Sequence, residues 1–347
     1  MKSPRARLAE PSRLRTATLF LCCVFFVLPA CRAHPHTVQR AQMLMGTVVR
    51  VTAVAPAEDT AQRAAAAGLA EVRRVEERLS TWIPTSDLSR VNAAAGQTPV
   101  KVGPDALAVV QRSLEIAELT EGGFNIAVGP AVDAWGVMEE QRIPDPAELA
   151  RLQPLTDWRQ VQVDPRAGTI FLARPGMRLD VGGIGKGYAA DLAARAMQQA
   201  GATAGVIALS GDLKMFGRMP EGHQFRFGIQ HPRQRGALVG ELDLENEAIS
   251  TAGDYERFFE RDGLRYHHIL DPRTLQPARA SQSVTVVAGE GVWADGLDTG
   301  IFVMGPEKGM ALVERLPGVE AVIVDHEGQI YISSGLRSRI HRHDAMP

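Results

Sequence analysis

The position of the cysteines is the feature that most constrains how this chain can fold. All three, Cys22, Cys23 and Cys31, lie within the first 31 of 347 residues. Cutting the chain before Cys31 leaves a body of 317 residues (347 minus 30) with no internal disulfide, no thiol nucleophile inside the fold and no cysteine-bound metal. A body of that size buries enough apolar surface to be stable without such cross-links.

The first thirty residues have the pattern of an export signal. Five basic residues and one acid precede the apolar run TATLFLCCVFFVLPAC (16–31), which has the length of a signal-peptide core and is short for a membrane-spanning helix. Its last four letters resemble a bacterial lipobox, in which the cysteine is lipidated and begins the mature chain. We therefore expect a lipoprotein signal peptide over 1–30, a tether over 31–42 and a lipid anchor at Cys31, which holds the exported protein on the periplasmic side of a bacterial cell membrane. The alternatives are cleavage by ordinary signal peptidase and an uncleaved anchor.

The charge of the chain is close to balanced, with 38 Lys and Arg against 40 Asp and Glu and a formal net charge of −2. No block rich in Lys and Arg follows the leader, so a nucleic-acid partner is not expected. The 45% of hydrophobic and 22% of charged residues are typical of a globular protein with a large core.

Helical and strand-like patterns alternate irregularly along the body. Apolar spacing and the placement of Pro and Gly predict helices over 60–79, 104–121 and 187–200. Strand-like runs cover 46–54, 205–211, 225–230, 282–289, 320–325 and 329–333, and the last two are joined by a hairpin turn, DHEG. This order predicts an α+β fold with mixed α/β layers in one compact unit of one or two lobes.

A glycine-rich stretch, LDVGGIGKGYAAD (179–191), follows what we expect to be a short strand. It is not a Walker A loop, because Asp180 stands where that motif needs its first glycine and Gly187 replaces the Ser or Thr after the lysine. It does not fit the dinucleotide fingerprint either. Its glycines nevertheless let backbone approach a ligand, the following helix presents its N-terminus to anions, and Lys186 adds positive charge. Two interpretations stay open: a phosphate or pyrophosphate ligand, and a tight turn with a surface lysine.

A second polar pattern lies in WADGLDTGIFVMG (293–305). Asp295, Asp298 and Thr299 are spaced i, i+3 and i+4, which places them on one face of a helix. Two carboxylates and a hydroxyl are oxygen ligands of the kind that Mg²⁺ prefers. The alternative is the capped start of a helix with a polar surface face.

Two histidines stand side by side in the segment YHHIL (266–270). If this segment is a strand, His267 and His268 point to opposite faces. At most one of them is then expected to face a site, where histidine can accept a proton because it titrates near neutral pH.

Eight pieces of the sequence, in order, resemble the ApbE family, the FAD:protein FMN transferases. They are MGT (45–47), LSTWIPTSDLSRVN (79–92), GGFNIAVGPAVDAWG (122–136), LDVGGIGKGYAAD (179–191), LSGDLKMFG (209–217), ISTAGDYERFF (249–259), YHHILDPRT (266–274) and WADGLDTGIFVMG (293–305). No single piece is decisive, but together they are specific. The resemblance implies an ApbE-type, T-fold-like catalytic domain over 43–340, followed by a tail over 341–347.

The resemblance also implies a reaction. Enzymes of this family bind FAD as a substrate, cleave its pyrophosphate with Mg²⁺, release AMP and leave FMN in a phosphoester with a Thr or Ser of an acceptor flavoprotein. The acceptor would be a respiratory or other extracytoplasmic redox protein. Phosphoryl transfer mainly requires positioning and charge neutralisation, which these polar motifs can supply. Two other functions fit the same residues: hydrolysis of FAD to FMN and AMP, and flavin binding by a non-catalytic lipoprotein.

The family motifs also assign roles to residues at the proposed reaction centre. The side chains of Asp295 and Thr299 and the backbone carbonyl of Gly183 would bind Mg²⁺. Asp298 stands where the family usually has a small residue, and we expect it to join or neighbour the metal. His268 matches the family's second histidine and would take or relay the proton of the acceptor hydroxyl, unless it serves only as a structural hydrogen-bonder.

The remaining expected contacts are to the flavin nucleotide. The residues are Met45, Trp82, Asn125, Asp180, Lys186 and Ile269. Trp82 would stack on the flavin where the family commonly has Tyr, unless it is a core residue, and Ile269 would act through its backbone. Asn125 stands where the family tends to have Asp, and Ser210 replaces the first glycine of a Gly-Gly pair, so the surroundings of the nucleotide depart from the family pattern.

Overall fold

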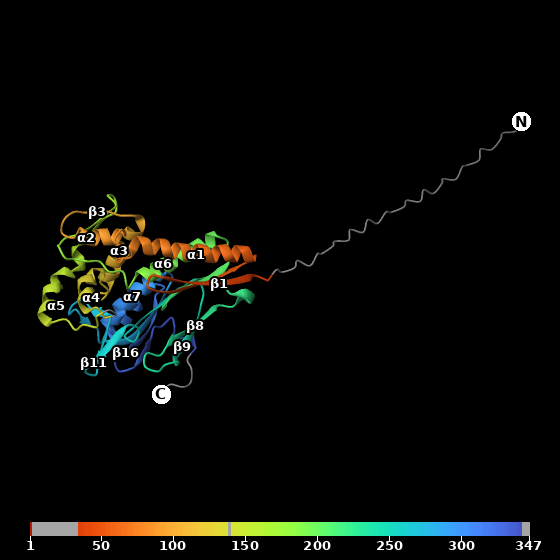
Figure 1. Cartoon of the computed structure of the whole chain (residues 1–347). Helices are drawn as coiled ribbons and strands as arrows, with labels where there is room; N and C mark the ends of the chain where they lie inside the picture. The colour runs from red at the N-terminus through yellow and green to blue at the C-terminus, as the bar shows by residue number, and fades with distance from the viewer. Residues whose placement is uncertain (2–33, 138–139, 342–347) are drawn as a thin grey trace. The chain divides into compact units, whose positions relative to one another are not determined.

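Figure 1 shows the computed structural model of the chain, which describes Met1 and residues 34–137 and 140–341. From His34 onward the chain forms one compact unit. The rest of the expected signal peptide, the lipid anchor at Cys31 and most of the expected tail lie outside the described residues. Within the described ranges, no helix is both long enough and apolar enough to cross a membrane.

An eight-stranded antiparallel sheet forms the centre of this unit. In spatial order its strands are β1 (His36–Leu44), β2 (Thr47–Ala55), β6 (Ala204–Leu209), β7 (Asp212–Phe216), β10 (Ala248–Gly253), β15 (Ser281–Ala288), β16 (Glu320–Asp325) and β17 (Ile330–Ile332). Five of the predicted strands are confirmed here, with small shifts at their ends, and β16 and β17 form the predicted hairpin. β15 is buried along its whole length, as expected for an inner strand of a covered sheet.

The edge strand β1 corrects the predicted tether. From the sequence we expect residues 31–42 to lie outside the domain, but the strand already begins at His36 and pairs with β2 along all nine of its residues. Most β1 side chains are exposed at the sheet edge, so the segment lacks the apolar alternation by which a strand is recognised. Only its pairing with β2 makes it a strand.

The helices confirm the predictions from periodicity. They are α1 (Glu58–Leu79), α2 (Asp87–Ala93), α3 (Pro104–Leu119), α4 (Gly129–Trp135), α5 (Pro146–Leu152), α6 (Gly185–Gln199), α7 (Gly291–Met304) and α8 (Pro306–Val313), with short 3-10 turns at Ile126–Val128, Gln153–Leu155, Trp158–Gln160 and Pro220–Gly222. The three predicted helices are α1, α3 and α6. Pro104 begins α3, and Gly201, with a φ of +97°, follows the end of α6, as their conformational preferences predict.

The central sheet is covered on both faces. Helices α1, α6 and α7 pack on one face (Figure 1), where Val49 and Val51 of β2 join the largest hydrophobic cluster. Val54 of β2 points the other way and belongs to a second cluster. That second cluster contains residues of a small three-stranded sheet, so the unit has three layers: helices, large sheet and small sheet.

Smaller sheets and hairpins complete the structure. The three-stranded sheet of the second cluster consists of β18 (Ile340–His341), β9 (Leu238–Leu244) and β8 (Phe225–Gln230). Another three-stranded sheet consists of β3 (Val100–Lys101), β5 (Thr169–Leu172) and β4 (Val161–Asp164). Two pairs of strands form separate two-stranded sheets: β11 (Phe258–Arg261) with β12 (Leu264–His267), and β13 (Leu270–Asp271) with β14 (Gln276–Pro277). β8 is the sixth predicted strand. β18 ends one residue inside the expected tail. The predicted α+β class with mixed layers is confirmed.

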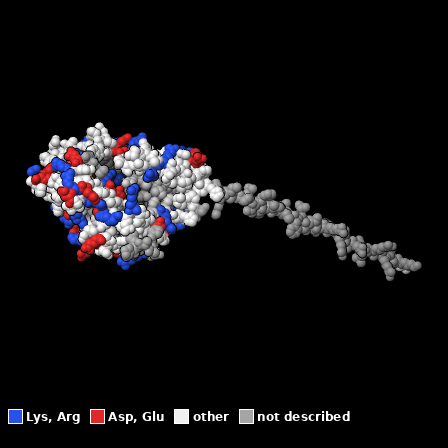
Figure 2. All heavy atoms as spheres, turned by 60° about the horizontal axis from the view of Figure 1, so that its bottom comes forward, with Lys and Arg blue, Asp and Glu red and all other residues white. Residues whose placement is uncertain are grey.

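Charged side chains of both signs lie interspersed on the face of the molecule that Figure 2 shows. Many of them are paired at the surface, as Arg226 is with Asp243 and Arg218 with Glu245. Exposed pairs of this kind add little to stability.

Candidate functional site

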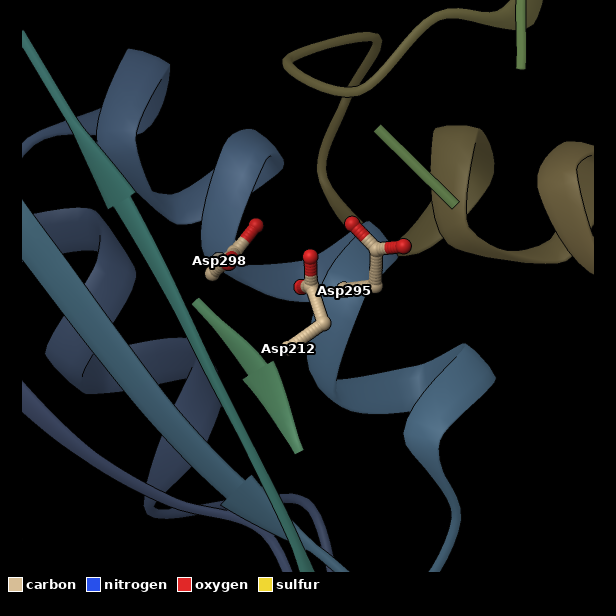
Figure 3. A group of neighbouring side chains, drawn as sticks. All are labelled: Asp212, Asp295 and Asp298. Atoms are coloured by element: carbon tan, nitrogen blue, oxygen red, sulfur yellow. The ribbon is translucent and has the colours of Figure 1, made fainter. Parts of the chain in front are cut away.

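Helix α7 carries two carboxylates into the protein interior. Asp295 and Asp298 are only 2% and 3% exposed, and Figure 3 shows both beside Asp212 of β7. α7 packs against α3, α6 and the strands β10 and β15, so nearly every side of it is buried. The alternative of a polar surface face is therefore excluded. Buried carboxylates require compensating partners.

Asp212, the first residue of β7, completes a group of three carboxylates. Oxygen atoms of Asp212, Asp295 and Asp298, one from each residue, all lie within 4.8 Å of one another. Asp212 is not among the site residues predicted from the sequence, although it stands in the motif LSGDLKMFG. The sequence clue was an acid directly after the Ser-Gly turn between two strands. In that turn Ser210 has a φ of +59°, a conformation that is uncommon for residues other than glycine.

Two hydroxyl groups contact this carboxylate group. Ser250 of β10 lies between two acids: its Oγ is 2.6 Å from Oδ2 of Asp298 and also contacts Asp212. Thr299 donates from Oγ1 to Oδ1 of Asp298 at 3.1 Å. Because the Ser250 hydroxyl has one proton, it can donate to only one of its two carboxylate neighbours.

Lys186, near the start of α6, is the cation of the group. Its Nζ lies 2.7 Å from Oδ2 of Asp212 and 3.5 Å from Oδ1 of Asp295. The amide of Gly187 donates to Oδ2 of Asp295 at 2.8 Å. With all three carboxylates ionised, they and the one ammonium carry a formal charge of −2. One divalent cation would balance that charge, and the oxygen donors suit Mg²⁺.

The pKa values reflect the excess of negative charge. Burial, followed by the charge of Asp212, raises the pKa of Asp295 to about 7. Burial and the neighbouring carboxylates raise the pKa of Asp298 well above its ordinary value. Burial acts to lower the pKa of Lys186, but the carboxylates outweigh it, so the pKa is raised and the ammonium stays charged. A bound cation would relieve the remaining repulsion.

The glycine-rich turn that precedes α6 also lies beside the carboxylate group. A Cβ built on Gly183 would lie 3.1 Å from Oγ1 of Thr299, so the backbone of Gly183 borders that hydroxyl. Asp180 accepts a hydrogen bond from the amide of Gly182 at 2.7 Å, and burial raises the pKa of Asp180. The structure therefore brings together Gly183 and Thr299, two of the expected metal ligands.

The short strand expected before this turn does not form. The amide and the carbonyl of Leu179 are both bonded to the side chain of Asn92 in α2, at 2.7 and 3.0 Å. The amide of Asp180 donates to the carbonyl of Ile126 at 2.8 Å. Side-chain and loop partners replace a neighbouring strand here and satisfy the backbone groups at the entry to the turn.

Met45 lies in the turn between β1 and β2. Met45 and Gly46 have φ values of +50° and +69°, as in a two-residue type I′ hairpin. The amide of Met45 donates to Oε1 of Glu76 at 2.6 Å. The Cε atom of Met45 lies 3.6 Å from a Cβ built on Gly185, so this side chain borders the start of α6.

The two histidines face different surroundings. His267 is 1% exposed; its Nδ1 accepts from the amide of Ile269 at 3.3 Å, and its Nε2 is 2.8 Å from the carbonyl oxygen of Ala278. With Nδ1 accepting, Nε2 carries the proton. Burial lowers the pKa of His267 to about 4. His267 is thus a neutral, structural residue.

His268 is exposed, immediately after the end of β12. Its Nδ1 lies 3.3 Å from the carbonyl oxygen of Arg257, so the ring is oriented while Nε2 makes no hydrogen bond to any described residue. Neighbouring protein atoms displace water from part of the ring, and this desolvation, followed by the charges of His267 and Arg257, lowers the pKa of His268. The ring is therefore neutral near physiological pH, and because Nδ1 donates to the carbonyl oxygen, Nε2 has the lone pair that can accept a proton.

Three other residues expected to contact the nucleotide lie in different settings. Trp82 is 78% exposed, which excludes the alternative of a core residue. Asn125 is buried and donates from its side-chain amide to the carbonyl of Thr156 at 2.7 Å. The carbonyl of Ile269 accepts from the amide of Ala278 at 2.9 Å. None of the hydrogen bonds among described residues joins these three to the carboxylate group.

Comparisons with known sequences agree with the resemblance. The sequence profile of the ApbE family matches residues 45–323. The FAD:protein FMN transferase of Treponema pallidum is 34% identical over 353 residues, which cover 94% of this chain and 95% of that protein. A protein of the same name from Klebsiella pneumoniae is 35% identical, over 91% of this chain and 93% of that protein.

Solved structures show the same fold. The crystal structure of the ApbE protein from Thermotoga maritima superposes with a TM-score of 0.81 at 29% identity, covering 89% of this chain and 100% of that one. The flavin transferase ApbE from Vibrio cholerae gives a TM-score of 0.79 at 27% identity, with coverage of 88% and 99%. Profile, sequence and fold agree over most of the length, and this chain belongs to the ApbE family.

Proposed function

We propose that this protein is an FAD:protein FMN transferase that depends on Mg²⁺. An oxygen of a Thr or Ser in an acceptor flavoprotein bonds to the FMN phosphorus of FAD, the phosphorus–oxygen bond to AMP breaks, and the hydroxyl proton passes to a base. Family membership and the names of the relatives support the transferase activity. The buried carboxylate group supports the dependence on a metal ion.

The observation that carries the proposal is the charge of that group. Asp212, Asp295 and Asp298 are buried within 4.8 Å of one another, with Lys186 as the ammonium beside them. The three carboxylates, the Thr299 hydroxyl and the Gly183 carbonyl would hold Mg²⁺. The ion would offset charge on the pyrophosphate and on the leaving AMP.

Other residues would position the substrates. The start of α6, with its glycine-rich turn and Lys186, offers backbone amides and positive charge to the phosphates. Met45 borders this helix start and would contact the flavin nucleotide as an adaptable apolar side chain. The exposed ring of Trp82 is free to stack on a flavin. The neutral His268 would accept the proton of the acceptor hydroxyl.

We further propose that the protein is exported and held at a bacterial membrane by a lipid on Cys31, facing the periplasm. The basic start, the short apolar run and the cysteine after small residues support this location. Labelling cells with a radioactive fatty acid tests it: the wild-type protein should be labelled and Cys31→Ala should not. A labelled Cys31→Ala protein would contradict the lipid site.

One experiment distinguishes the proposed function from its alternatives. The mature protein is incubated with FAD, Mg²⁺ and a candidate acceptor domain, and in-gel flavin fluorescence is recorded after denaturation. We expect a fluorescent acceptor band that requires Mg²⁺ and the acceptor Thr or Ser. Free FMN and AMP without a labelled acceptor would instead indicate an FAD pyrophosphatase. Unchanged FAD bound to the protein, with several acceptors tried, would indicate a non-catalytic flavin-binding lipoprotein.

A further inference from the structure

Helix α7 begins without a cap of its own. Its N-cap residue Glu290 makes no side-chain hydrogen bond to the helix, although the first amides of a helix have no partner inside it. Asp191 of α6 supplies the cap instead: its two carboxylate oxygens accept from the amides of Gly291 and Val292 at 2.7 and 3.0 Å. Asp191 is 7% exposed, so this bond between two helices is shielded from water.

A second attachment lies just before the helix. Lys214 of β7 donates from Nζ to the carbonyl oxygen of Gly289. Lys214 is half-buried and also attracts Asp191 electrostatically. The start of α7 is therefore held from two directions, by α6 and by β7.

The backbones of α6 and α7 touch at the same place. A Cβ built on Gly187 would lie 2.1 Å from the carbonyl oxygen of Gly291, and one built on Gly291 would lie 2.5 Å from the carbonyl oxygen of Gly187. No side chain fits between the helices, so their separation is fixed. The elements that hold the start of α7 are thus the two that carry Lys186 and Asp212 into the carboxylate group.

We propose that Asp191 and Lys214 are positioning residues for the metal ion of the proposed reaction. Asp295 follows Val292 by three residues, less than one helical turn, so a shift at the start of α7 moves its carboxylate relative to Asp212. Mg²⁺ tolerates little departure from octahedral geometry, and residues that orient metal ligands commonly change metal affinity by about 10- to 100-fold. This inference rests on the proposed function, which takes the carboxylate group as a Mg²⁺ site.

The test measures Mg²⁺ and Mn²⁺ binding to the mature protein by titration calorimetry, without FAD or acceptor. Asp191→Asn keeps the size of the side chain but weakens the hydrogen bonds that it accepts from the amides of Gly291 and Val292. Lys214→Met removes the hydrogen bond to the carbonyl oxygen of Gly289. We expect each variant to bind both ions more weakly by about tenfold or more. Asp191→Glu should recover part of the loss.

Asp325→Asn is the matched control. Asp325 is 5% exposed and accepts from the amides of Glu327 and Gln329, both at 2.9 Å, within the turn between β16 and β17. We expect this control to lower the unfolding temperature about as much as Asp191→Asn while leaving metal affinity within about twofold of wild type. A general loss of stability would weaken binding in both proteins, whereas a positioning role affects only Asp191→Asn.

Kinetics give a second measurement. In Asp191→Asn, kcat should fall while the KM for FAD changes by less than about threefold, because the positioning residue acts on the metal ligands. Wild-type metal affinity in both Asp191→Asn and Lys214→Met would overturn the inference and leave the proposed function intact. A loss of metal affinity in Asp325→Asn equal to that in Asp191→Asn would do the same. If Asp191→Asn does not fold, Lys214→Met decides alone. A wild-type protein that binds neither ion would overturn both proposals.

Discussion

The amide of Gly187 donates a hydrogen bond to Oδ2 of Asp295 at 2.8 Å and so joins the start of α6 to the second turn of α7. The bond depends on a missing side chain: a Cβ on Gly187 would lie 2.1 Å from the carbonyl oxygen of Gly291 and 2.7 Å from Cβ of Asp295. The glycine that disqualifies this stretch as a Walker loop thus brings α6 close enough to orient a carboxylate on another helix.

Gly187→Ala should therefore destabilise the protein. Overpacking against backbone atoms typically costs about 1–3 kcal/mol, and we expect a decrease of that size in the free energy of unfolding, measured by urea denaturation. Gly289→Ala is the matched control, because no atom lies within 4 Å of a Cβ built there. The control should change the free energy of unfolding by less than about 0.5 kcal/mol; equal losses in the two variants would argue against a specific contact at Gly187.

Lys186→Met should separate metal binding from substrate binding. Removing the ammonium changes the formal charge of the carboxylate group from −2 to −3, and a unit charge a few ångströms away contributes on the order of several kcal/mol at the effective dielectric of a protein. We expect Mg²⁺ affinity to rise at least about tenfold, by calorimetry near pH 8, and the KM for FAD to rise as well. Unchanged metal affinity would show that Lys186 does not share a site with the ion.

The contrast between α7 and Asp212 shows how much of the site the sequence could predict. The i, i+3, i+4 spacing of Asp295, Asp298 and Thr299 follows from helix geometry alone, and the structure places these residues together. Asp212 comes from the strand β7, and its proximity to Ser250 depends on the pairing of β7 with β10. Strand order is a long-range property that no local pattern contains.

The same limit explains the other differences. β1 is a polar edge strand, so nothing in its own residues separates it from a tether. Asp191 lies in the glycine-rich motif, yet its role as the cap of α7 joins residues a hundred positions apart. By contrast, the predictions for α1, α3 and α6 held because apolar periodicity, Pro and Gly act locally.

His267 should make stability depend on pH. Its pKa is lowered from 6.5 to about 4 in the folded protein, so between these values the unfolded chain binds the proton more readily. The stabilisation by neutral His267 is fully present above about pH 6.5 and is lost as the pH falls toward 4; its size is about 3 kcal/mol, taking about 1.4 kcal/mol per pKa unit. Urea denaturation of wild type and His267→Gln at several pH values measures this. A parallel pH dependence in the two proteins would contradict the assignment.

His268→Asn tests the proposed base. Loss of a positioned general base commonly lowers a rate by about 10²- to 10⁴-fold, and we expect the rate of acceptor labelling to fall within that range while FAD affinity changes little. Single-turnover labelling with preloaded FAD gives the rate of the chemical step. A wild-type rate would show that His268 is not a base and that the acceptor hydroxyl loses its proton without its help.

The most direct test of the account is the stoichiometry of the reaction in wild type and Asp295→Ala. AMP release is measured by chromatography, and FMN on the acceptor by intact mass spectrometry, with FAD binding checked by fluorescence. The account predicts one AMP per FMN-labelled acceptor for the wild type, and FAD binding without AMP or label for Asp295→Ala. Full labelling by Asp295→Ala would contradict a metal-dependent transfer at this carboxylate group.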